Sequence, residues 1–409
     1  MLKRMTAALG AAVLLVPLAA CGGSSGSDGA TRIKVVMAQY SPQSASYWKD
    51  VVQRFEAANP KVKVDLQVLD WNTILQQVPT MIQTKSFPDV LNYNAFSEYA
   101  KAGLLYNLDE VTDPQLRSDF QTTFTQNASL DGKPYGIPWI ASVRSLGYNK
   151  DALAKLGVAE PPKTWDELRT VAEKAKQAGY TGYGLPLGSE EAQAEFSLWM
   201  WGNGGDWKTG GKWSINSPKN VETLKFLRGL SSAKLTEENP GKANRTDAVW
   251  SQFAQGNVAM AAIMPLGTFQ SSVMKDSKVN WASAPFPVNA GGTPSTLGVQ
   301  DYLLAFKKRN NQAAVKSFLT FAYDKGNYLK FVRDEGFLPV TGSASAEMAG
   351  DPVAGPGIAL MPTARFYPLT DPAWNAVMKA VQSELGTAME PGADPKAVLD
   401  SLQKTAERG

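Results

Sequence analysis

The feature that most constrains the fold of this chain is an alternation of short β-branched runs with amphipathic stretches, which begins at residue 31. Residues 31–39 (TRIKVVMAQ), 62–69 and 89–93 have the character of strands, whereas residues 44–59 and 72–85 have helical periodicity. Strands that alternate with helices form crossover units, and these build a largely parallel sheet with helices on both faces. We therefore predict an α/β fold.

The same pattern restarts further along the chain. Residues 135–139 and 146–149 are strand-like, and the capping-box sequence Thr164-Trp-Asp-Glu167 opens a helix that runs to residue 178. Two polar runs, residues 141–145 and 297–303, interrupt the pattern. A length of 409 residues is typical of two or three domains. We predict two α/β units between which the chain crosses more than once.

Composition narrows the function classes. The chain has no His, one Cys, 11 Trp and a formal net charge of +3. Without His, it lacks Ser-His-Asp and Cys-His nucleophile pairs, His general bases and His-ligated zinc. A single Cys excludes an internal disulfide and a Cys-ligated iron–sulfur cluster. The small net charge is not that of a nucleic-acid-binding protein. No cofactor is indicated, and the many Trp residues favour a binding protein.

The N-terminus indicates export. Residues 1–4 are cationic, and residues 5–20 are apolar but too short to span a bilayer. Leu18-Ala-Ala-Cys21-Gly22 resembles the lipobox of bacterial lipoproteins, which implies cleavage before Cys21 and a lipid on its sulfur. The alternative is an ordinary signal peptide with an incidental Cys. We expect residues 1–20 to be a lipoprotein signal peptide and residues 21–30 the lipidated Cys with a flexible Gly/Ser tether, which anchor the protein to the outer face of the cell membrane.

Several sequence motifs occur in a characteristic order. They are Phe87-Pro-Asp-Val90 with Tyr99–Leu108, Tyr135-Gly-Ile-Pro138, Leu146–Asp151, Pro161–Leu168, Phe253–Gly267 and Gly336-Phe-Leu-Pro339. Each is short, but their order and spacing together resemble the family 1 extracellular solute-binding proteins, the maltose-binding-protein-like receptors of ABC sugar importers. The resemblance runs from about residue 31 to 342 and is weaker beyond.

This resemblance implies a two-lobed, type II periplasmic-binding-protein-like fold, with a ligand cleft between lobes that are joined by a hinge. By analogy, lobe one comprises residues 31–142 plus 302–342, and lobe two residues 143–301 plus 343–409. In open parallel sheets, ligands bind outside the carboxyl ends of the strands. That rule selects candidate ligand residues.

Sugars present apolar C–H faces and rims of hydroxyl groups, so a sugar site needs flat aromatic rings and planar polar groups. Tyr40 and Trp71 follow the first two predicted strands, and Asn92-Tyr93-Asn94 ends the third. We expect these residues to contact the ligand. The alternatives are packing within the lobe for the aromatic residues and turn capping for the Asn residues.

Four candidates lie at the predicted crossings. Trp139 and Arg144 belong to the first crossing, and Gly298 and Asp301 to the second. Trp139 is expected to line the cleft, and Asp301 to accept hydrogen bonds from ligand hydroxyls. Arg144 is either a bidentate donor to the ligand or part of a structural ion pair.

Lobe two supplies the remaining candidates. Trp199 and Trp201 are two residues apart on one helix and cannot face the same way, so we expect one in the core and one in the cleft. Met264 ends a strand where the resembled family often has an aromatic residue, which weakens the expected ring stacking there. Arg365, in the last linker, either reaches the cleft or packs on the surface.

Together these features predict the substrate-binding component of an ABC importer. It is expected to bind a mono- or oligosaccharide, to present it to permease subunits by closing its lobes, and to act as a monomer without a nucleic-acid partner. It is not predicted to be an enzyme. Two alternatives remain: a lipid-anchored hydrolase or lyase that uses carboxylates only, and the same receptor class with a ligand such as a polyol, amino sugar or glycerophosphodiester.

Overall fold

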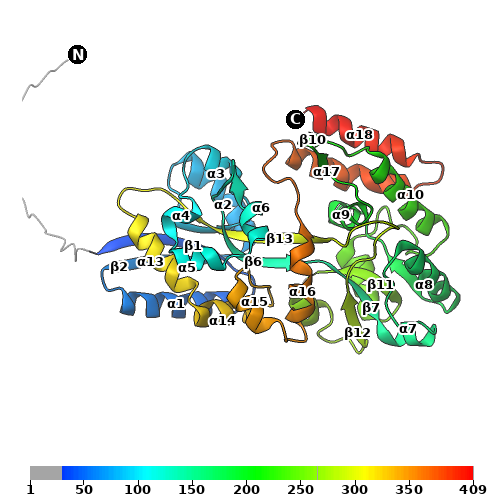
Figure 1. The fold of residues 1–409 in the computed structure, drawn as a ribbon, viewed down its shortest axis with the longest axis horizontal. Helices are drawn as coiled ribbons and strands as arrows, with labels where there is room; N and C mark the ends of the chain where they lie inside the picture. The colour runs from blue at the N-terminus through cyan, green and yellow to red at the C-terminus, as the bar shows by residue number, and fades with distance from the viewer. Residues whose placement is uncertain (1–29, 265, 409) are drawn as a thin grey trace, which may run out of the picture.

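The computed structural model describes residues 30–264 and 266–408. The predicted signal peptide, Cys21 and nearly all of the tether therefore lie outside the described residues. Two α/β lobes lie side by side, and strands β6 and β13 run between them (Figure 1). The α/β class predicted from the alternating pattern is confirmed.

Lobe one is built on a sheet with the strand order β14-β13-β3-β1-β2, and β6 pairs with β13. Strand β1 pairs in parallel with β2 and β3, whereas β13 runs antiparallel to β3 and β6. The elements of this lobe are β1 (Thr31–Ala38), α1 (Ser44–Ala58), β2 (Val62–Leu69), α2 (Trp71–Gln83), β3 (Val90–Tyr93), α3 (Ser97–Lys101), α4 (Leu108–Val111), α5 (Pro114–Asp119), α6 (Thr122–Asn127), β4 (Ser129–Leu130), β5 (Lys133–Pro134), β6 (Ile137–Val143), α13 (Gln312–Ala322), α14 (Lys325–Glu335), α15 (Gly342–Met348) and α16 (Ala354–Leu360).

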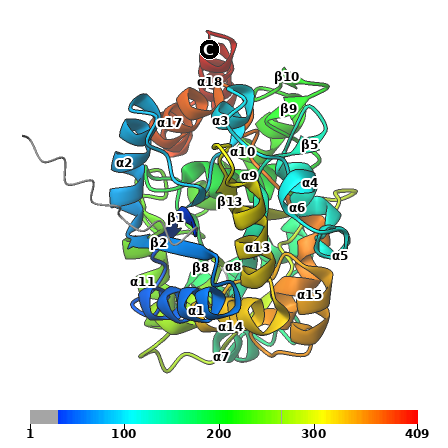
Figure 2. The same ribbon diagram turned by 90° about the vertical axis from the view of Figure 1, so that its left-hand side faces the viewer.

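Strand β1 shows why helices cover both faces of this sheet. Val35 and Met37 pack in one apolar core, and Val36 and Ala38 pack in another, because successive side chains of a strand point to opposite faces. Helix α1 contributes to the first core and α2 to the second. Figure 2 shows these two helices on opposite sides of β1 and β2.

The C-terminal boundary of lobe one differs from the prediction. Helices α15 and α16 were assigned to lobe two, but Ala344, Met348 and Met361 are buried in the same core as Phe55 of α1. Residues 343–361 therefore belong to lobe one by packing. The family motifs end near residue 342, so the sequence held no signal for this segment.

Lobe two has a four-stranded sheet in the order β12-β7-β11-β8, in which β11 runs parallel to β8 and antiparallel to β7. Its elements are β7 (Ser145–Asn149), α7 (Lys150–Lys155), α8 (Trp165–Gln177), β8 (Thr181–Gly184), α9 (Ala192–Gly202), β9 (Lys208–Thr209), β10 (Lys212–Trp213), α10 (Pro218–Ser232), the π-helix η1 (Arg245–Trp250), α11 (Ser251–Ala254), β11 (Val258–Ile263), α12 (Leu266–Thr268), the π-helix η2 (Phe269–Val273), β12 (Trp281–Ala284), α17 (Trp374–Glu384), the 3-10 helix η4 (Leu385–Met389) and α18 (Pro395–Arg408). The predicted capping box is present, since Thr164 and Glu167 each bond the other's backbone N–H at the start of α8.

Three segments form the hinge between the lobes. They are the β6–β7 junction at Arg144, strand β13 (Thr296–Ala305), and the 3-10 helix η3 (Met361–Thr363) with strand β14 (Ala364–Arg365). Strand β13 spans the lobes, because Leu297 is buried in the core of lobe two and Leu303 in that of lobe one.

The two lobes also touch away from the hinge strands. Gly267 of α12 lies against Gly336, which ends α14 with a φ of +72°. A Cβ atom on Gly267 would stand 2.7 Å from the Gly336 Cα, so only glycine permits this approach.

None of the described helices is long and apolar enough to cross a membrane.

Candidate functional site

Lobe one presents aromatic rings where its parallel strands end. Tyr40 lies just beyond β1, Trp71 opens α2 just beyond β2, and Tyr93 is the last residue of β3. The ring centroids of Tyr40 and Trp71 are 5.9 Å apart, and those of Trp71 and Tyr93 are 6.4 Å apart. The parallel pairing of β1 with β2 and β3 brings these three predicted residues together.

Tyr40 also contacts Phe337, which lies in the motif Gly336-Phe-Leu-Pro339 but was not among the candidate ligand residues. Its ring packs on Phe337 at 4.9 Å, in the loop that follows α14. This loop borders a cavity of about 390 Å³ between the lobes, which Phe337 and Glu335 line from lobe one and Gly267 and Gln270 from lobe two. The aromatic cluster therefore adjoins a space that both lobes enclose.

The Tyr40 hydroxyl joins β3 to the hinge. It donates to Asp301 Oδ2 at 2.7 Å and lies 3.1 Å from Asn92 Oδ1. Asn92 is fully buried and donates to the Tyr302 carbonyl oxygen at 3.1 Å. Burial raises the pKa of Asp301 to about 6, although the Tyr40 hydrogen bond acts in the opposite direction. Burial also raises the pKa of Tyr40 well above its ordinary value, so Tyr40 remains a neutral donor.

The register of the hinge strands places Asp301 and Arg144 on one face. Val299 pairs with Ser142, and Asp301 pairs with Ile140. Paired residues of antiparallel strands share a face, and alternate residues repeat it. The Arg144 N–H donates to the Leu297 carbonyl at 3.1 Å, so the ladder extends past β6 and Arg144 follows Ser142 on this face. Val299 is 40% exposed on this face, whereas Ser142 and Asp301 are each 9% exposed.

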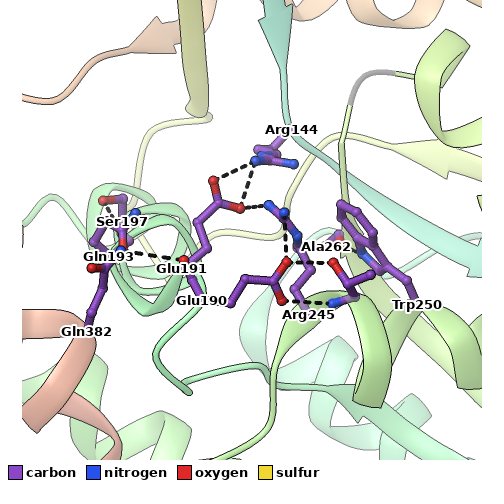
Figure 3. A network of polar contacts seen from close by, with 10 residues as sticks. Arg144, Glu190, Glu191, Gln193, Ser197, Arg245, Trp250, Ala262 and Gln382 are labelled. Atoms are coloured by element: carbon purple, nitrogen blue, oxygen red, sulfur yellow. Dashed lines mark hydrogen bonds and ion pairs between the residues drawn. The ribbon is translucent and has the colours of Figure 1, made fainter. Parts of the chain in front are cut away.

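Lobe two contributes a cluster of ion pairs, drawn in Figure 3. Arg144 Nη2 donates to both carboxylate oxygens of Glu191, at 3.0 and 2.9 Å. Arg245 pairs with the same carboxylate and also donates to Glu190 Oε1 at 3.1 Å. The four residues come from the hinge, the loop between β8 and α9, and the start of η1. They alternate in charge, so each guanidinium is paired.

Burial and an aromatic ring set the electrostatics of this cluster. The Arg245 guanidinium lies 4.3 Å from the centroid of the Trp250 ring. Burial, with repulsion from Arg144, lowers the pKa of Arg245 to about 10. Burial also lowers the pKa of Arg144, although neighbouring anionic groups oppose the shift. Both side chains remain cationic at neutral pH.

Glu190 keeps its charge for a different reason. Burial raises the pKa of its carboxyl group, but the hydrogen bonds from the hydroxyl and N–H of Thr246, together with Arg245, outweigh that effect and lower the pKa. The two Thr246 bonds measure 2.5 and 3.0 Å. Glu190 is thus an anion held in place.

Glu195 lies beneath the ion pairs in helix α9. It is buried, and it accepts hydrogen bonds from the Tyr183 hydroxyl at 2.5 Å and from Trp199 Nε1 at 2.8 Å. Burial raises the pKa of Glu195 to about 7 despite these bonds. With Arg144, Glu191 and Arg245, it borders a cavity of about 20 Å³, which is the size of one water molecule.

The structure contradicts the prediction that Trp139 lines the cleft. Its side chain is 0% exposed and packs against Trp48, Tyr328 and Phe331 at centroid distances of 4.9 to 5.4 Å. All seven residues of β6 are buried, so β6 lacks the polar alternation that identifies an exposed face. Trp139 is a core residue of lobe one.

Neither Trp of α9 is exposed to the cleft, which contradicts the expectation that one of them would be. Trp199 bonds Glu195, and the buried Trp201 donates to Asp206 Oδ1 at 3.0 Å. Every residue of α9 is buried, because other elements of lobe two surround this helix. Because α9 has no exposed face, Trp199 and Trp201 both point into the core of lobe two although they lie on different sides of the helix.

Gly298 and Arg365 also lie away from the cleft. A Cβ atom on Gly298 would stand 2.6 Å from the Phe366 ring, on the face of β13 opposite Asp301. Gly298 is therefore a packing glycine and not a ligand residue. Arg365 is ion-paired with Asp206, and its guanidinium lies 5.4 Å from the centroid of the Trp201 ring. It packs on lobe two, which was the alternative considered for it.

The remaining candidates have mixed placements. Asn92 is buried and accepts a hydrogen bond from the Tyr40 hydroxyl, whereas Asn94 is exposed beyond β3. Met264 is partly buried at the end of β11. Asn94 and Met264 stay candidates.

Sequence reasoning missed Glu190, Glu191, Arg245 and Phe337. Glu190 and Glu191 come soon after β8, so the rule of strand ends would have found them had it been applied to that strand. Arg245 follows no strand, and the sequence carries no signal for it. Phe337 also follows no strand, but it lies in the motif Gly336-Phe-Leu-Pro339, which the rule of strand ends does not connect with a ligand. Among the described residues, no group of three or more Cys, Asp or Glu side chains is placed to hold a metal ion.

Comparison with known proteins identifies the class. Residues 40–328 match the family model of the bacterial extracellular solute-binding proteins, which is well over half of the chain. The chain therefore belongs to this family, and the receptor class expected from the sequence motifs is confirmed.

Particular relatives agree with this assignment. A putative binding protein of Brucella abortus is 29% identical over 405 residues, covering 96% of this chain and 97% of the relative. The maltodextrin-binding protein MdxE of Bacillus subtilis is 24% identical over 365 residues, covering 84% and 82%. The crystal structure of the cyclic alpha-maltosyl-1,6-maltose binding protein from Arthrobacter globiformis has a TM-score of 0.80 at 19% identity, covering 93% of this chain and 99% of that chain. That likeness shows a shared two-lobed fold. The family and these relatives are binding proteins.

Proposed function

We propose that this chain is the receptor of an ABC importer that binds a mono- or oligosaccharide between its lobes and delivers it to permease subunits by lobe closure. The observation that carries the proposal is the gathering of Tyr40, Trp71 and Tyr93 at the strand ends of lobe one, with the Tyr40 hydroxyl bonded to Asp301 of the hinge. Flat rings suit the C–H faces of a sugar, and carboxylate and guanidinium groups suit its hydroxyls.

The arrangement of the site also explains how a ligand would favour closure. A ligand shifts an equilibrium between open and closed lobes only by its difference in affinity for the two states. The aromatic rings belong to lobe one and the Arg245 cluster to lobe two, so a ligand that reaches both favours the closed arrangement. The names of the maltodextrin- and cyclic-oligosaccharide-binding relatives support a sugar ligand.

Charge pairing in lobe two argues against an anionic ligand such as a glycerophosphodiester. Arg144 and Arg245 are the cations nearest the hinge face in this cluster, and both are paired with Glu191. A phosphate group that takes the place of Glu191 on these guanidiniums would have to displace a partly buried carboxylate. We therefore favour an uncharged or cationic ligand over an anionic one.

The proposal is tested by thermal shift and tryptophan fluorescence of the purified protein against a broad sugar panel. At least one sugar should raise the melting temperature and change the fluorescence. Trp71→Ala should lower the affinity for that sugar at least tenfold and leave the fold intact, because Trp71 is only partly buried. Trp281→Ala is the control: Trp281 pairs with Asn149, at the end of β7 far from the hinge. If no sugar of the panel binds, the sugar assignment is wrong.

We further propose that a lipid on Cys21 holds the receptor at the outer face of the cell membrane. The support is the lipobox-like run that ends at Cys21, the single Cys of the chain. Cys21→Ser should release the protein from the membrane fraction, and mass spectrometry of the wild-type N-terminal peptide should show a diacylglyceryl modification. An unmodified Cys21 in membrane-bound protein would contradict this proposal.

A further inference from the structure

We propose that the ligand is a saccharide that carries a protonated amine, and that Asp301 binds this amine with Tyr40 and Trp71 beside it. The inference rests on the proposed sugar-binding function and specifies its substrate class. It follows from the charge and burial of one carboxylate on the hinge face that also carries the exposed Val299.

Asp301 is a buried anion without a cation. Its residue is 9% exposed, and its one side-chain donor among the described residues is the Tyr40 hydroxyl on Oδ2. No Lys or Arg of the described part of the chain forms an ion pair with it, whereas the likewise buried Asp89 is paired with Lys308. Buried carboxylates are costly unless a cation or several donors compensate them. Among the described residues, no side chain donates to Asp301 Oδ1, so this oxygen can take a positive partner.

The lobe-two cations cannot supply that partner. Arg144 lies on the same face of the hinge, but its guanidinium is bound to both oxygens of Glu191. In the ladder, Arg144 lies opposite Leu297, four residues along β13 from Asp301, and a strand rises about 3.4 Å per residue. The two side chains thus start roughly 13 Å apart. Arg245 is held by Glu190 and Glu191.

The groups around Asp301 suit an ammonium group. Tyr40 donates to Oδ2, which leaves Oδ1 to accept from a ligand. The Tyr40 ring centroid lies 5.9 Å from that of Trp71 and 4.9 Å from that of Phe337, and aromatic faces attract cations. Glu335, which accepts from the Ser44 hydroxyl at 2.6 Å, adds a second negative charge near Tyr40. Carboxylates and rings without a free cation favour a positively charged ligand over a neutral one.

Matched sugars that differ only in the group on C2 of each residue test the proposal. D-glucosamine, N-acetyl-D-glucosamine and D-glucose present an amine, an acetamide and a hydroxyl at the same position, and chitobiose, N,N′-diacetylchitobiose and cellobiose form the corresponding β-linked set. Affinities are measured by calorimetry at about pH 7, where Asp301 is ionised. An amine-bearing sugar should bind at least tenfold more tightly than its acetamide and hydroxyl counterparts, since hydrogen bonds to charged groups are the stronger ones.

The variant Asp301→Asn separates charge from shape. It should weaken the amine-bearing sugar about 10- to 100-fold and remove most of its advantage over the hydroxyl analogue. Asp65→Asn, on the exposed side of β2, removes the same charge elsewhere and should leave the affinities unchanged.

Each outcome decides a different claim. If sugars of the broad panel bind but the amine gives no advantage in either set, the amine proposal is wrong and the sugar-binding function stands. If Asp301→Asn weakens the amine and its hydroxyl analogue equally, Asp301 binds a hydroxyl and the proposal is also wrong. If no sugar binds at all, both the proposed function and this inference fail.

Discussion

Glu191→Gln probes the paired guanidiniums of lobe two with a near-isosteric change. Glu191 is the shared partner of Arg144 and Arg245, so the substitution removes the charge that both guanidiniums contact. Arg245 keeps Glu190, whereas Arg144 loses its only ion-pair partner among the described residues. The repulsion between the two guanidiniums, which already lowers the pKa of Arg245, would then be less compensated.

The magnitude follows from burial. The side chains of Arg144 and Glu191 are 11% and 22% exposed. Breaking a fully buried pair from one side costs about 3–5 kcal/mol. Because Glu191 retains some contact with solvent, we expect Glu191→Gln to lower the free energy of unfolding by about 2–3 kcal/mol. The surface pair of Asp50 and Arg54, with side chains 57% and 45% exposed, provides the control, and Asp50→Asn should cost under about 1 kcal/mol.

Urea denaturation followed by far-UV circular dichroism measures both variants. A double variant, Arg144→Met with Glu191→Gln, removes the uncompensated charge and should recover part of the lost stability. The reasoning is refuted if Glu191→Gln costs no more than Asp50→Asn, because the ion pairs would then behave as solvent-exposed ones. It is also refuted if Arg144→Met brings no recovery.

Three further changes test the structure at other points. Trp139→Ala should lower the free energy of unfolding by about 3–5 kcal/mol, as expected for a core aromatic residue, and the folded fraction should still bind ligand. Loss of binding with unchanged stability would show instead that Trp139 contacts the ligand. Gly267→Ala places a Cβ against Gly336 and should separate the lobes at that contact. Small-angle X-ray scattering of the free protein should then show a larger radius of gyration. An unchanged radius would show that the contact is not maintained in solution. For Glu195, whose pKa is raised from 4.5 to about 7, the folded state binds the extra proton, so this group's contribution to stability is full below about pH 4.5 and is lost as pH rises through 7. The stability of wild type relative to Glu195→Gln should therefore fall by about 3 kcal/mol between pH 4.5 and 7, and parallel pH profiles would contradict the shift.

Local sequence patterns predicted the secondary-structure elements of residues 31–93 and the aromatic residues that lobe one contributes to the candidate site. The alternation in residues 31–93 predicted β1, α1, β2 and β3 to within a residue or two. The rule that ligands bind at strand ends selected Tyr40, Trp71 and Tyr93, and these residues lie together. Both predictions depend on spacing along the chain, because parallel strands with short connections bring their carboxyl ends to one edge.

The wrong predictions concern residues for which the sequence pattern does not show which side of a helix or strand is covered by other elements. Strand β6 and helix α9 are buried on all sides, so Trp139, Trp199 and Trp201 carry no periodic signal that separates core from cleft. Gly298 was selected from its position at a crossing, but the face it occupies depends on the register of β13 with β6.

The sequence by itself determined the α/β class, the family and the order of the elements, because these follow from periodicity and from motifs in adjacent residues. Only the tertiary structure decided the charge of the site. Arg144, Glu191 and Arg245 are far apart in the chain and meet through the hinge, the β8–α9 loop and η1. Asp301 lies beside Tyr40, and no Lys or Arg of the described residues pairs with it. Whether a charged side chain is paired or open to a ligand depends on contacts across the fold, and no local pattern encodes them.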